Sequence, residues 1–312
     1  MADPIAAESK VLLAKIEGTY GSDPAPTGAA NAILATGFQV SPMEAEEASR
    51  DLERPYRGGQ EQVPVAIRGV MTFSTELAGS GAAGTAPAWG PLARACGMAE
   101  TINAGVDVSY APISASYESV TIHFWQGPTR HVFLGCRGTA TITVPAQAIP
   151  RIRWTFTGIW TQPSDQAPAT PTLTAFQEPL VATTVNTPVF TVDAVSLVLR
   201  QLSFDLANQV EPRFLIGADA VVIVDSAELI SATIEATPLA TFNPFSLAYQ
   251  RTKVAVALTH GTVAGNIVAI SAPTSQVGRP TGQEENQKVI EWPITLRPLP
   301  NVGNDQFSIT LT

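Results

Sequence analysis

Alternation of apolar and polar side chains is the dominant pattern in this chain, and it is most regular between Ser119 and Arg137. Apolar and polar residues alternate through residues 120–126 (VTIHFWQ), with the period of two that a half-buried strand requires. Gln126–Pro128 interrupts the run with turn-forming residues, and Arg130–Cys136 then runs back. The segment therefore predicts a β-hairpin.

A weaker copy of this pattern lies in the second half of the chain, at Lys253–Ala272. His260-Gly261 supplies the turn there, and alternating apolar residues flank it. Two such hairpins in similar surroundings favour two copies of one β domain, residues 1–175 and 176–312, joined at the polar, proline-rich segment Gln162–Thr174. Two unrelated β domains are the alternative.

The remaining pattern predicts an all-β chain with short flanking helices, arranged as a β-sandwich or barrel. Pro87–Gly97 and Phe242–Gln250 are expected to form the short helices. Val11–Ile16 fits either a helix or an extended arm. Further strands are expected at Ile33–Val40, Val65–Leu77, Val106–Pro112, Thr139–Val144, Ile152–Trp160, Glu228–Ala236, Ile290–Leu296 and Phe307–Leu311.

Charge is scarce in the chain but concentrated in one segment. Only 14% of residues are charged, against roughly 25% in typical soluble domains. Pro42–Gly59 departs from this, which predicts either a solvated surface loop or a loop that contacts a neighbouring subunit. The charged residues of this candidate inter-ring contact loop are Glu44, Glu46, Glu47, Arg50, Asp51, Glu53, Arg54 and Arg57.

The low charge also bears on partners. A surface with so few charges indicates extensive contact with other subunits, or else a polar surface rich in Thr, Ser and Gln. The net charge is −9, and the acidic excess is shared by both halves of the chain. No basic cluster predicts tight binding to a phosphate backbone. An acidic surface is compatible with DNA passing by without adhering.

Candidate chemistry is sparse. The sequence contains no nucleophile elbow, phosphate-binding loop, zinc-protease motif or dinucleotide fingerprint. Cys96 and Cys136 are the only cysteines, and we expect two buried, reduced thiols. The histidines of the first hairpin are expected on the exposed face of a strand. We therefore predict no enzyme activity, metal or cofactor. Without a signal peptide or an apolar span, folding in a cytoplasm and no membrane insertion are expected.

The first half of the chain resembles the major tail tube proteins of long, non-contractile-tailed bacteriophages. The resemblance covers roughly residues 8–160. It is carried by Glu17-Gly18-Thr19-Tyr20-Gly21-Ser22-Asp23-Pro24, Arg50-Asp51-Leu52-Glu53-Arg54-Pro55-Tyr56, Pro91-Leu92-Ala93-Arg94-Ala95-Cys96-Gly97, Tyr110-Ala111-Pro112 and the hairpin at 119–135.

The resemblance implies a β-sandwich with a short helix and a structural role in the virion, as rings that stack around a channel for DNA ejection. With two tube-like domains per chain, we expect a trimer with approximate sixfold symmetry. Expected partners are further copies of the chain, the tape measure, tail terminator and distal tail proteins, and DNA in transit. The predicted lumen-lining residues are Thr121, His123, Trp125, Arg130, His131, Ala255, Thr259 and His260.

A receptor- or glycan-binding β-sandwich of a phage tail is the alternative function. Trp154, Trp160 and Trp292 lie on expected strands and could stack on sugars, although packing in the core is the simpler interpretation.

Overall fold

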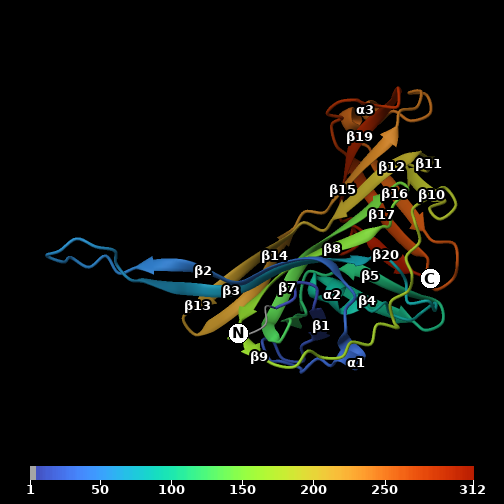
Figure 1. Ribbon diagram of the computed structural model, residues 1–312. Coiled ribbons are helices and arrows are strands. Elements are labelled where there is room, and N and C mark those ends of the chain that lie inside the picture. Colours follow the sequence, from blue (N-terminus) through green and yellow to red (C-terminus); the bar gives the residue numbers. More distant parts are fainter. Residues whose placement is uncertain (1–4) are drawn as a thin grey trace.

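The computed structural model describes residues 5–312 and shows an all-β protein (Figure 1). Strands make up 51% of the chain and helices 6%, which confirms the predicted fold class. Most strands belong to one continuous, strongly curved 18-stranded sheet, and two further strands form a separate ribbon.

The first half of the chain contributes a series of six antiparallel strands. Their spatial order is β2-β3-β8-β7-β6-β1, which combines pairs of sequence neighbours with the distant pairs β3–β8 and β6–β1. The strands are β1 (Lys10–Ile16), β2 (Thr36–Ser49), β3 (Gln62–Glu76), β6 (Val120–Gln126), β7 (Thr129–Pro145) and β8 (Arg151–Trp160). The predicted hairpin at Ser119–Arg137 is confirmed as β6–β7.

The second half contributes six strands in a matching order, β12-β15-β19-β17-β16-β10. Each strand has a counterpart at the same place in the first series, and the predicted second hairpin is confirmed as β16–β17. The strands are β10 (Val189–Val192), β12 (Leu199–Asp205), β15 (Leu229–Glu235), β16 (Lys253–His260), β17 (Val268–Val277) and β19 (Val289–Pro298).

The edge strand of the second series joins the end of an inner strand of the first series. The end of β7, Thr141–Pro145, pairs with Gln201–Asp205 of β12, and β20 (Ser308–Leu311) links β17 to β5 (Asp107–Pro112). Buried side chains of both halves form one continuous hydrophobic core. The smaller strands are β4 (Met98–Asn103), β9 (Ser164–Asp165), β11 (Val195–Ser196) and β18 (Glu284–Asn286).

Two hairpins extend from the body in the same general direction (Figure 1). The longer one is β2–β3, and the other is the separate ribbon of β13 (Asn208–Leu215) and β14 (Ala218–Ser226). The prediction of a charged loop over Pro42–Gly59 is wrong for its first part, because residues 42–49 continue β2. The strand is longer than expected because it pairs with β3 as far as Ser49 and Gln62.

The helices are short. They are α1 (Gly28–Asn31), α2 (Gly90–Ala95) and α3 (Pro244–Gln250). α2 and α3 lie within the predicted segments Pro87–Gly97 and Phe242–Gln250, whereas α1 was not predicted. Both α2 and α3 have a proline in the first turn, where a missing N–H is tolerated. Val11–Ile16 is extended, as part of β1, while β2 begins at Thr36 rather than at Ile33.

The segment predicted as a linker is packed against the body. Ala169 and Leu173 contact a small apolar cluster of Leu13, Ala32 and Trp125. The N–H of Thr172 also donates to the carbonyl of Gly28 at 2.9 Å. The chain therefore crosses between the two strand series along the surface of the first one.

Candidate assembly surfaces

The predicted lumen hairpin is a central element within the chain. Strand β6 lies between β1 and β7, and its burial is nearly complete along its length. Thr121, His123 and Trp125 are 0%, 3% and 4% exposed. The expectation of an exposed strand face is wrong for His123, because residues 17–32 and 169–173 cover the face that the alternation left polar.

A buried carboxylate holds that cover in place. Glu17 accepts hydrogen bonds from the hydroxyls of Ser119 and Thr121, both at 2.6 Å. It also accepts from the backbone N–H groups of Gly21 at 2.8 Å and Gly135 at 2.7 Å. Four donors offset the cost of burying the charge. Sequence reasoning gave Glu17 no role, although it begins the first segment that carries the family resemblance.

The same segment connects the two halves of the chain. The N–H of Val221 in β14 donates to the hydroxyl of Tyr20 at 2.6 Å, and Arg137 donates to the carbonyl of Val221 at 2.9 Å. The Arg137 guanidinium lies 4.9 Å from the centre of the Tyr20 ring. Gly135 has a φ of +58°, and a Cβ there would lie 2.7 Å from that ring. This contact fixes the base of the β13–β14 ribbon.

His123 is a buried residue with a structural role. Its Nε2 lies 2.9 Å from a carboxylate oxygen of Asp23. Burial lowers the pKa of His123, and this effect exceeds the opposing attraction of Asp23. Burial also lowers the pKa of His131. His123 lies 100 residues after Asp23 in the sequence, so only the fold brings these two side chains together.

The other predicted lumen residues fall into two groups. Arg130, His131 and Thr259 are half-buried, and Ala255 is exposed. His260 is 1% exposed, and its Nδ1 lies 2.9 Å from the hydroxyl of Thr187. Burial lowers the pKa of His260 as well. Within one chain, Arg130, His131, Ala255 and Thr259 are therefore the members of the set that keep exposed surface.

The charged hairpin β2–β3 is the most exposed part of the molecule. Every residue from 46 to 65 is exposed, and the tip lies far from the body (Figure 1). Four of its charges form two ion pairs within the hairpin, Arg50 with Glu61 at 2.9 Å and Arg68 with Glu44 at 3.6 Å. Of the predicted contact residues, Glu44, Glu46 and Glu47 lie on β2, while Arg50, Asp51, Glu53, Arg54 and Arg57 belong to the tip.

Apolar side chains are exposed among these charges. They are Met43, Leu52, Tyr56, Val63 and Val65, with exposed fractions between 41% and 68%. A projecting ribbon that exposes apolar and charged side chains together has the composition of a contact surface.

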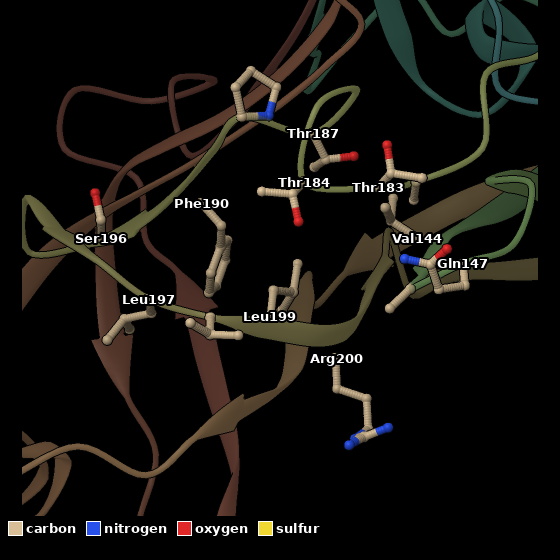
Figure 2. A pocket seen from close by; sticks show the side chains of 14 residues that line it. Val144, Gln147, Thr183, Thr184, Thr187, Phe190, Ser196, Leu197, Leu199 and Arg200 are labelled. Atoms are coloured by element: carbon tan, nitrogen blue, oxygen red, sulfur yellow. The ribbon is translucent and has the colours of Figure 1, made fainter.

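A cleft of about 270 Å³ lies where the end of β7 meets the start of β12 (Figure 2). Phe190, Leu197 and Leu199 line one side, and threonines of the 183–187 segment line the other. Arg200 is its only ionisable lining residue, and its guanidinium is bound to the carboxylate of Glu291. The cleft therefore offers no general acid or base.

Within residues 5–312 no three His, Cys, Asp or Glu side chains come together as a metal site would require. Cys96 and Cys136 are free and buried, as predicted, and burial raises the pKa of both thiols. No helix in this part of the chain is long and apolar enough to cross a membrane. Trp154 and Trp292 lie in the core.

Comparison with known proteins gives the family. No curated protein matches the chain. The family model described as phage tail tube protein matches residues 8–299, and this span includes both strand series and the β2–β3 hairpin. The match confirms the resemblance and extends it beyond the first half. This chain therefore belongs to the phage tail tube protein family.

Proposed function

We propose that this protein is the structural subunit of a phage tail tube, in which copies of the chain close into rings and the rings stack around a channel for DNA. The family match over residues 8–299 carries the proposal. The protein then acts as a virion component assembled in the host cytoplasm, with a mechanical rather than an enzymatic role.

The matching order of strands supports three copies per ring. Series β2-β3-β8-β7-β6-β1 and series β12-β15-β19-β17-β16-β10 follow the same pairing scheme within one chain. This is the pattern left by a duplicated domain, with residues 1–175 and 176–312 as its two copies. Three chains would then supply six similar units around the channel, with threefold closed symmetry and approximate sixfold symmetry.

The net charge of −9 suits a channel for DNA. A wall of like charge repels the phosphate backbone and keeps the duplex from adhering during ejection. Arg130, His131, Ala255 and Thr259 remain candidates for lumen-facing positions, because each keeps exposed surface in the single chain. None of the four is acidic, so the repulsive charge is assigned to other residues of the wall. The ends of such a tube would meet the tape measure, tail terminator and distal tail proteins.

Ring stacking is assigned to the β2–β3 hairpin. Its tip lies far from the body (Figure 1) and exposes Leu52 and Tyr56 among charges of both signs. A ribbon of this length reaches beyond its own ring. Its rim charges would set the register of the contact more than its strength.

Electron microscopy of the purified protein tests the proposal. We expect rings and tubes with threefold symmetry of the whole chain, and a persistent monomer would contradict it. Replacing residues 50–61 by Asn-Gly, a two-residue hairpin turn, should leave rings intact and abolish stacking. A control of full length, with Glu53→Gln and Arg54→Gln, separates loss of the ribbon from loss of charge. Tubes of normal length from the shortened variant would contradict the assignment.

A further inference from the structure

The two strand series can be superposed by their hydrogen bonding. The N–H of Leu77 donates to the carbonyl of Pro150 at 3.0 Å, and that of Ala236 donates to Ile290 at 2.9 Å. Each bond closes the strand pair that ends there, with Glu76 opposite Arg151 in one series and Glu235 opposite Glu291 in the other. These matches define equivalent positions in the two series from backbone hydrogen bonds alone, without a sequence alignment.

Strand β12 has a neighbour on both sides, but its counterpart β2 does not. β12 pairs with β15 on one side and with the end of β7 on the other. In residues 5–312, β2 pairs with β3 alone. The burial of the apolar side chains differs accordingly. Leu202 and Phe204 of β12 are 2% and 0% exposed, whereas Phe38 and Val40 of β2 are only half-buried.

The strand that would pair with β2 can be located by the same equivalence. In the first series Thr143, near the end of β7, lies opposite Arg151. In the second series the residue opposite Glu291, the counterpart of Arg151, is Glu284 of β18. Strand β18 pairs with β19 only, so its outer edge is open within the described chain. β18 in the second series is therefore equivalent to the end of β7 in the first series, the segment that pairs with β12.

The helices α2 and α3, which hold equivalent places in the two series, also differ in how far they are covered. The end of α2 is covered by the second half of the chain, where the side-chain amide of Asn208 donates to the carbonyl of Cys96 at 2.7 Å. The counterpart α3 lacks such a cover, and its Phe245 and Tyr249 are 43% and 89% exposed. Leu239, shortly before α3 in the sequence, is exposed, and so are Val289 and Ile290, the residues of β19 that pair with β18.

We propose that the open edge of β2 in one copy pairs antiparallel with the open edge of β18 in a second copy, and that the docked strand covers α3. The register of β7 with β12, in which Thr143 faces Ser203, places Gln39 opposite Glu284 of the second copy. Strand addition of this kind satisfies the backbone groups of both edges. The pairing rests on the proposed ring assembly and names its contact surfaces.

The geometry of the chain makes this contact head-to-tail. β2 is one arm of the long hairpin and projects from the body with it. α3 lies at the far end of the second series, away from this hairpin (Figure 1). Because the two surfaces differ, each copy uses one surface toward each neighbour, and a closed rotation gives a ring. Junctions within a chain, β7–β12, would then alternate with junctions between chains, β18–β2.

A cysteine pair tests the register. Both native cysteines are buried, so Gln39→Cys with Glu284→Cys introduces the reactive thiols. Under mild oxidation we expect covalent dimers and trimers on a non-reducing gel. Gln39→Cys with Ser164→Cys, an exposed position on β9, is the matched control and should remain monomeric on the gel. Equally efficient linkage of Gln39→Cys alone would indicate a symmetric β2–β2 contact and overturn the proposal.

Blocked surfaces give a second test. Gln39→Asp with Ser41→Asp places like charge against β18, and Tyr249→Arg places charge on the bare face of α3; all three positions are exposed, so folding should persist. Each variant alone should be monomeric in sedimentation, and an equimolar mixture should stop at one-to-one dimers. Rings from either variant would overturn the pairing and leave the tail tube function standing, whereas wild-type protein without rings would contradict both.

Discussion

The two strand series place equivalent elements in different surroundings. In the second series β12 is enclosed by β15 and β7, and its counterpart β2 is left as an edge. In the first series α2 buries Gly90, Leu92, Ala93 and Ala95, while α3 buries only Pro244. The elements themselves form in both places. What differs is whether another part of the same chain covers the element. β2 and α3, which are not covered in this way within the described chain, mark the surfaces that a second chain can cover.

The largest expected effect comes from comparing Phe204→Ala with Phe38→Ala. Phe204 is fully buried and packs edge-on against Phe307, with ring centres 4.9 Å apart. Its loss should lower the free energy of unfolding by about 3–5 kcal/mol, as for buried aromatic residues generally. Phe38 is half-buried, so its loss should cost the monomer less. Urea denaturation of monomeric protein measures both.

The assembled state sharpens this comparison. If a second copy covers β2, Phe38→Ala should weaken ring formation by more than its effect on the monomer predicts, and Phe204→Ala should not. Equal effects of Phe38→Ala on monomer and ring would show that β2 is no more buried in the assembly.

A smaller effect is expected from the helices. Leu92 in α2 is 0% exposed, and Leu92→Ala should cost about 2–5 kcal/mol of unfolding free energy. Leu247 occupies α3 and is half-buried, so Leu247→Ala should cost the isolated chain clearly less. Thermal and urea denaturation test the difference. Similar losses for the two variants would mean that α3 already has its full packing within one chain.

The smallest of these effects is a dependence on pH shared by both series. Burial lowers the pKa of His123, His131 and His260 below the usual value of 6.5. As the pH falls through about 6.5, the unfolded chain binds protons that the folded chain does not, so stability is lost toward acid and is fully present above that value.

The melting temperature at pH 7.5 and 5.5 measures this loss. His260→Gln should reduce the difference between the two temperatures, because one proton-binding group is removed from the unfolded state. A difference unchanged in that variant would assign the acid sensitivity to other groups. The exposed pair Arg50 and Glu61 provides a control, since Glu61→Gln should change stability by under about 1 kcal/mol.

Local patterns in the sequence predicted much of the fold. The alternation in residues 120–126 and 253–260 and the turns after them were sufficient for both hairpins. The apolar stripe of Leu92, Ala93 and Cys96 with Gly97 as a stop predicted α2, and the matching order of the second half predicted α3. Apart from that order, these signals depend on residues within one or two turns of each other, which is why they can be read without the fold.

Tertiary structure decided which of those elements are covered. The polar face of β6 looked solvent-exposed because Glu17 and Asp23, which pair with Thr121 and His123, lie about a hundred residues earlier. The length of β2 likewise depended on β3, and the junction of β7 with β12 depended on strands about sixty residues apart. Sequence by itself determined the family, both hairpins and many of the other strands. Long-range pairing decided burial, and with it which two edges of the sheet remain open.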